Sequence, residues 1–141
     1  MAKQISIFLE NKPGGLSSVT KALSDAKINI RALSLADTSD FGILRVILSE
    51  PEKAKDLLTA KGFTVTLSDV VCLFVPNTPG TLSEALILLA ENNVAIDYMY
   101  AFAWKDDLAR VVIKADDSKR CIEVLQRSNL QLAKASELYD F

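Results

Sequence analysis

The chain has 141 residues, a net charge of −2 and a pI near 5.1, so it has room for one ordinary domain or two small ones. Half of its residues are hydrophobic and 24% are charged, which is typical of globular proteins and excludes the disordered class. The weakly acidic balance predicts no nucleic-acid partner. The sequence has no run near ~20 apolar residues, which predicts no membrane partner. It starts without a secretory signal, so we expect a cytoplasmic location.

Histidine is missing from the sequence, and there are two cysteines. The lack of histidine excludes Ser-His and Cys-His nucleophile pairs, imidazole zinc sites and the commonest general base. Cys72 and Cys121 lie in apolar runs and form no Cys-x-x-Cys pair, so we expect buried, reduced thiols. The sequence therefore predicts no catalytic residue, no metal site and no cofactor.

The first half of the chain predicts the order strand, helix, strand, strand, helix, strand. Apolar residues recur at helical spacing from Leu16 to Ala26, which predicts an amphipathic helix after the first strand. Ser49 and Glu52 are spaced to cap the second helix, and Gly62 is placed to end it. The predicted strands are 6–9, 28–37, 41–48 and 63–67.

The second half predicts the same order of elements. Its predicted strands are 70–76, 94–104, 108–114 and 130–135, and its predicted helices are 82–92 and 117–128. Thr81 and Glu84 have the spacing of another capping box. No linker rich in Gly, Ser or Pro separates the halves.

An internal repeat underlies this similarity. The run Asn11-Lys12-Pro13-Gly14-Gly15-Leu16-Ser17 aligns with Asn77-Thr78-Pro79-Gly80-Thr81-Leu82-Ser83 at an offset of 66. Further along, Ile43 to Leu48 align with Leu108 to Ile113 at an offset of 65, which makes Arg45 and Arg110 equivalent. We predict an α+β protein with two tandem ferredoxin-like βαββαβ units, residues 1–68 and 69–141, whose antiparallel sheets lie side by side with the helices on one face.

The repeated Asn-x-Pro-Gly turn is the first candidate for a site. Proline fixes one φ angle, and glycine lets the backbone approach another group closely. The helix that follows leaves its first amides unpaired and its positive dipole end toward the turn, where a small carboxylate would fit. The alternative is a turn that only connects strand to helix, with Asn11 and Asn77 capping locally.

These motifs, together with Ile28-Asn29-Ile30 at the start of the second strand, resemble the ACT domain, a family of amino-acid-sensing regulatory modules. The second half departs from the pattern, with Val94-Ala95-Ile96 where the family often has an asparagine. In that family, paired units bind amino acids in the seam between them. The contacts come from the first turn of one unit and the start of the second strand of the other.

The resemblance implies two sets of ligand contacts. The first comprises Asn11, Gly14, Gly15 and Leu16, with Asn29 and Ile30 opposite; the second comprises Asn77, Thr78, Gly80, Thr81 and Leu82, with Asp97 or Tyr98 near the strand. Backbone amides would hold the ligand carboxylate, and Asn29 or Asp97 would accept from its ammonium group. Because Ala95 stands where the first half has Asn29, we expect the two seams to differ.

An aromatic row is a further feature. Tyr98, Tyr100, Phe102 and Trp104 alternate along one predicted strand and should therefore point to one face, where the first half has small residues. We expect that face to be the open face of the sheet and to mediate a homodimer by sheet stacking. The alternative is that long polar neighbours cover the rings.

The sequence thus predicts a regulatory protein without enzymatic activity that binds a free L-amino acid and signals to an enzyme partner or to its own assembly. Two alternatives stay open. A small enzyme on the same fold would have to use Asp, Lys or Cys, and an RNA-binding module could stack bases on the aromatic row. The acidic pI argues against the second.

Overall fold

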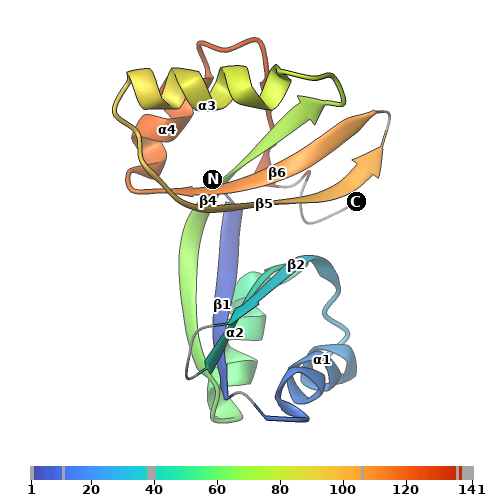
Figure 1. Cartoon of the computed structure of the whole chain (residues 1–141). Coiled ribbons are helices and arrows are strands. Elements are labelled where there is room, and N and C mark those ends of the chain that lie inside the picture. The colour runs from blue at the N-terminus through green and yellow to red at the C-terminus, as the bar shows by residue number, and fades with distance from the viewer. Residues whose placement is uncertain (1, 11, 38–40, 106, 136, 138–141) are drawn as a thin grey trace. The chain divides into compact units, whose positions relative to one another are not determined.

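The computed structural model describes residues 2–10, 12–37, 41–105, 107–135 and 137, with the backbone alone at 103–105. These residues form two compact units, one made of Lys3–Ser68 and the other of Asp69–Leu138 with Ala2. Within the described part of the chain, no helix is long and apolar enough to cross a membrane. Each unit has the predicted βαββαβ order of elements (Figure 1).

The first unit has two helices and an antiparallel sheet in the ferredoxin-like order β2-β3-β1-β4. Strands β1 and β2 both pair antiparallel to β3. The elements are β1 (Ala2–Glu10), α1 (Gly15–Asp25), β2 (Ile30–Asp37), β3 (Phe41–Leu48), α2 (Pro51–Ala60) and the first part of β4 (Thr64–Pro76). β4 is one continuous strand where the sequence predicted two.

The second unit repeats this arrangement with the strand order β5-β6-β4-β7. Its elements are the second part of β4, α3 (Thr81–Glu91), β5 (Ile96–Lys105), β6 (Leu108–Ala115), α4 (Ser118–Leu125) and β7 (Gln131–Leu132). α4 ends earlier than predicted because the Ser128 N–H and hydroxyl both donate to the Leu125 carbonyl, at 2.9 and 2.6 Å, which tightens the last turn.

Each unit buries one face of its sheet under its two helices. In the first core, alternate residues of β1 and β3 meet the apolar stripe of α1, which includes Val19 and Leu23. The second core repeats this with alternate residues of β4 and β6, together with α3 and α4. The strand residues are Ile5, Ile7, Leu9, Leu44, Val46 and Leu48 in the first core, and Val71, Leu73, Val75, Val111, Ile113 and Ala115 in the second.

The strand register corrects the alignment of the third strands. Ile7 pairs with Leu44 in the first unit, and its counterpart Leu73 pairs with Val111 in the second. The third strands are therefore related by an offset of 67 instead of 65. Arg45 and Arg110 are not equivalent, although both face away from the helices.

Two predicted capping boxes are wrong. Glu50 precedes α2 and Gly80 precedes α3, and neither gives a side-chain cap. Ser49 instead accepts a hydrogen bond from the Asn29 N–H at 3.1 Å, and Thr81 donates to carbonyls within its own turn. Only α4 has a side-chain cap among the described helices, at Asp117, which accepts from the Arg120 N–H.

The aromatic row lies on the face opposite the second core, but the structure changes the prediction in two ways. Tyr98, Tyr100 and Phe102 are half-buried, so they form no fully exposed strip. The register of β5 also shifts between Phe102 and Trp104, so strict alternation does not reach Trp104, whose side chain is outside the described part. Leu33 and Leu35 of β2 lie on the side of the sheet that faces the helices, but the helices do not cover them: their exposed fractions are 54% and 51%.

We expect neither cysteine to be reactive in the folded protein. Burial raises the pKa of Cys72 to about 12, against an opposing effect of the Arg110 guanidinium. Burial, with the nearby Asp116 carboxylate, raises the pKa of Cys121 to about 11. At pH 8 both thiols stay protonated, so a thiol reagent should label neither cysteine until denaturant is added.

The same pKa shifts predict a loss of stability at alkaline pH. Above pH ~9 the unfolded chain releases thiol protons that the folded chain still holds, so the free energy of unfolding falls as the pH rises toward 11 to 12. Urea unfolding at pH 8 and pH 10 should show a smaller loss for Cys72→Ala than for the wild type. An equal loss in both proteins would contradict the assignment.

Candidate ligand-binding site

The turn before the first helix has the same backbone geometry in both units. Gly14 precedes α1 with φ 94° and ψ −14°, and Gly80 precedes α3 with φ 94° and ψ −16°. A Cβ at either position would have no heavy atom within 4 Å. These glycines are therefore needed for the left-handed conformation of the turn.

Side-chain hydroxyls hold the first turn from the helix side. The Gly14 carbonyl accepts from the Ser18 N–H at 3.0 Å and from the Ser17 and Ser18 hydroxyls at 3.1 and 2.7 Å. On the strand side, the Lys12 N–H donates to the Glu10 carbonyl at 2.8 Å. The predicted contact Asn11, which stands between them, lies outside the described residues.

In the second turn, one threonine makes additional bonds. The Thr81 hydroxyl donates to the carbonyls of Pro76, at 2.8 Å, and Thr78, at 2.9 Å. The Asn77 N–H donates to the Asp107 carbonyl at 2.8 Å. The first unit has Gly15 where this threonine stands, so its turn lacks the hydroxyl and the methyl group.

Two hollows flank the turn of the first unit. The larger has a volume of about 430 Å³ and is lined by Phe8, Leu9, Glu10, Lys12, Gly15, Phe41, Gly62, Phe63 and Thr64. The smaller, of about 290 Å³, is lined by Leu9, Glu10, Lys12, Pro13, Leu16, Leu35 and Gly42. Of the predicted contacts, Gly15 lines the larger hollow, and Leu16, which is 40% exposed, lines the smaller.

The predicted contacts at the second strand lie at the other end of each sheet. Ile30 pairs with Leu48 at one end of β3, whereas the turn adjoins the end where Gly42 pairs with Leu9. Six residues of strand separate these ends, which is roughly 20 Å. In the second unit, Asp97 and Tyr98 at the start of β5 are likewise remote from the turn before α3. No unit brings both halves of its predicted contact set together by itself.

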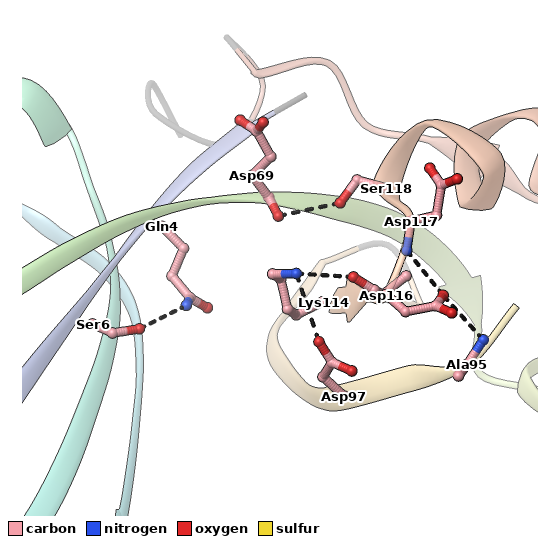
Figure 2. A network of polar contacts seen from close by, with 10 residues as sticks. Gln4, Ser6, Asp69, Ala95, Asp97, Lys114, Asp116, Asp117 and Ser118 are labelled. Atoms are coloured by element: carbon pink, nitrogen blue, oxygen red, sulfur yellow. Dashed lines mark hydrogen bonds and ion pairs between the residues drawn. The ribbon is translucent and has the colours of Figure 1, made fainter.

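The start of the second strand is held in the same way in both units. The Asn29 N–H donates to the Ser49 hydroxyl, and the Ser49 N–H donates to the Asn29 carbonyl at 3.0 Å. In the second unit the Ala95 N–H donates to the Asp116 carboxylate at 3.2 Å (Figure 2). The Asp116 N–H returns a bond to the Ala95 carbonyl at 3.0 Å. These bonds leave the exposed Asn29 side chain available to a ligand.

The environment of Asp97 differs from that of Asn29. The Lys114 ammonium lies 3.6 Å from the Asp97 carboxylate and also donates to the Ala115 carbonyl at 2.9 Å (Figure 2). An acceptor already paired with a cation is a weaker partner for a ligand ammonium group. Tyr98, the other predicted contact at this strand, is half-buried.

Sequence reasoning missed the residues that shape the larger hollow. Phe8 and Phe41 are on adjacent strands with ring centroids 5.6 Å apart in an edge-to-face arrangement. Phe63 follows Gly62, whose φ of 91° ends α2 and lets the Phe63 N–H donate to the Leu58 carbonyl at 3.1 Å. The exchange of threonine for Gly15 between the two aligned turns is the signal that could have identified this hollow.

No metal site accompanies these features in the described residues, where no three His, Cys, Asp or Glu side chains gather. The fold and the paired turns define a tandem of two ferredoxin-like units. A family profile described as ACT domain pair matches residues 1–141. The chain belongs to the ACT domain pair family.

Solved structures share this fold. Protein BT0572 from Bacteroides thetaiotaomicron is 46% identical, with a TM-score of 0.93 over 99% of this chain and 96% of that one. The regulatory subunits of aspartate kinase from Thermus thermophilus and Thermus flavus, both 16% identical, share the fold with TM-scores of 0.66 and 0.62. They cover 90% and 89% of this chain, and 92% and 90% of their own. No curated protein matches the chain.

Substitutions at the two adjacent glycines should separate the cost of a left-handed backbone from the cost of accommodating a Cβ atom. Gly14→Ala forces a left-handed alanine and should lower the free energy of unfolding by about 1–2 kcal/mol. Gly15→Ala is the matched control, because its Cβ would lie 3.6 Å from the Glu10 carbonyl oxygen and 4.0 Å from the Leu9 Cβ, which are ordinary contacts. Urea unfolding measures both, and a Gly15→Ala loss as large as that of Gly14→Ala would contradict the geometry.

Proposed function

We propose that this protein is a regulatory amino-acid sensor that binds a free L-amino acid where the turn of one ACT unit meets the second strand of another. The observation that carries the proposal is the repeated turn with a left-handed glycine, which sets a helix N-terminus beside a hollow in the first unit. Family membership supports the regulatory role.

The charges of an amino acid suit this arrangement. A helix N-terminus offers unpaired amides and the positive end of its dipole to the α-carboxylate. The Asn29 side chain carries an oxygen that can accept from the α-ammonium group. Because each unit keeps its turn and its second strand at opposite ends of the sheet, the two groups must come from different units, in one chain or in two.

The first turn with Asn29, which would then have to come from a second chain, is the stronger of the two proposed ligand sites. It combines a hollow with an exposed amide side chain. The second set has Thr81 bonded within its turn and Asp97 paired with Lys114. We therefore propose unequal occupancy, with the Gly15 turn binding first.

Regulation follows if the ligand binds one arrangement of units better than another. A ligand shifts such an equilibrium only by its difference in affinity for the two states. An enzyme partner or the protein's own assembly would sense the shift. We propose this signalling role instead of catalysis, with the chain acting in the cytoplasm.

A screen of the twenty amino acids by thermal shift tests the proposal. At a concentration 100 times its Kd, a ligand that binds only the folded state adds about 2.7 kcal/mol of stability. Asn29→Ala should remove most of the shift without lowering the Tm of the free protein, whereas the exposed Asn129→Ala, the matched control, should keep it. If no amino acid raises the Tm at millimolar concentration, the sensor proposal fails.

We further propose a homodimer through the sheet face opposite the helices that carries Tyr98, Tyr100 and Phe102. Light scattering at tens of micromolar should give twice the chain mass for the wild type. Tyr100→Asp should shift the protein toward the monomer, because a carboxylate on that face would lose its hydration in the dimer. Leu33→Asp, on the helix-covered face, is the control, and a monomeric wild type would contradict the proposal.

A further inference from the structure

The two repeats differ at one position of the turn in a way that changes the space beside it. The Thr81 hydroxyl bonds to the Pro76 carbonyl at 2.8 Å. The Cβ that Gly15 lacks would lie 3.6 Å from the Glu10 carbonyl oxygen, which is the counterpart of that acceptor. A threonine side chain therefore occupies in the second unit the place that stays open beside Gly15.

That open place is part of the hollow of about 430 Å³, a size within the ~300–1,000 Å³ of small-molecule sites. Its walls carry Phe8, Phe41 and Phe63, which come from three separate segments of the chain. By register and alignment, the second unit has Leu108 and Leu130 where the first has Phe41 and Phe63. The set of three phenylalanines is therefore present in the first repeat and not in the second.

The hollow has one charge of each sign at its edge. The Lys12 ammonium lies 3.0 Å from the Glu10 carboxylate, and both side chains are mostly exposed. An exposed ion pair contributes little to stability, so either group can turn to a ligand at small cost. The second repeat has the uncharged Pro76 and Thr78 at these positions.

We propose that this hollow takes the side chain of a zwitterionic amino acid whose side chain is aromatic or a large aliphatic group. The inference rests on the proposed function and specifies its ligand class. The α-carboxylate pairs with Lys12 and the first amides of α1, and the α-ammonium pairs with Glu10 in addition to the Asn29 side-chain oxygen of another unit. A ring fits edge-to-face against the phenylalanines, whereas a charged side chain would lose its hydration there and a small one would leave the wall uncovered.

Calorimetric titration with L-phenylalanine, L-leucine, L-alanine and L-glutamate tests the class of ligand. L-phenylalanine should bind the wild type at least tenfold more tightly than L-alanine or L-glutamate. N-acetyl-L-phenylalanine, which lacks the ammonium group, should bind at least tenfold more weakly than L-phenylalanine. Tighter binding of L-alanine or L-glutamate would overturn the inference.

Two substitutions place a residue of the second repeat at the equivalent position of the first. Gly15→Thr should weaken L-phenylalanine at least tenfold, because the side chain enters the hollow, while the Tm of the free protein stays close to that of the wild type. Ser24→Thr, on the exposed side of the same helix, is the matched control and should leave binding unchanged. Phe41→Leu, which keeps an apolar wall, should weaken L-phenylalanine but not L-alanine.

The outcomes separate this inference from the function on which it rests. If the wild type binds an amino acid with an affinity that Gly15→Thr and Phe41→Leu leave unchanged, the sensor stands and the pocket assignment falls. If the wild type binds no amino acid at millimolar concentration, both fall.

Discussion

Burial of one face of each sheet under two helices is the constraint on which the rest of the structure depends. Because side chains alternate along a strand, one buried apolar set fixes which residues face the helices and which face away. Both units keep that set, as Ile7 and Leu73 show by occupying equivalent core positions. The opposite faces are also buried in part, because Ile47 in the first unit and Val112 in the second are 0% exposed. There the repeats have nevertheless diverged to Ala32 in one and Tyr98 in the other.

The same constraint explains what sequence could and could not predict of the fold. Periodicity and turn residues were enough for the order of elements and for the duplication. They could not fix the pairing of the third strands, because an offset of 65 and one of 67 differ by two residues and place the same faces inward. The similar runs around Arg45 and Arg110 favoured the wrong offset, and only the hydrogen-bonded register decides.

At the candidate site, sequence predicted the local part and missed the long-range part. The Pro-Gly turns and their helix starts depend on neighbouring residues, so a motif reveals them. The lining of the larger hollow depends on Phe8 and Phe63, which are 55 positions apart in the numbering and reach the same hollow because β1 and β4 are neighbours in the sheet. The sequence around either phenylalanine does not indicate that both line the same hollow. The capping prediction at Ser49 failed for a related reason, since its hydroxyl is taken by Asn29.

The continuity of β4 matters for anyone who wishes to dissect the protein. Residues Thr64–Pro76 form a single strand that closes the first sheet and opens the second. A cut at the repeat boundary therefore falls inside a strand and not in a loop, and either fragment would end in a truncated strand with unpaired backbone groups. Such exposed edges recruit other strands, so separately expressed halves are expected to aggregate or to exchange strands, and study of the repeats is better served by substitutions within the full chain.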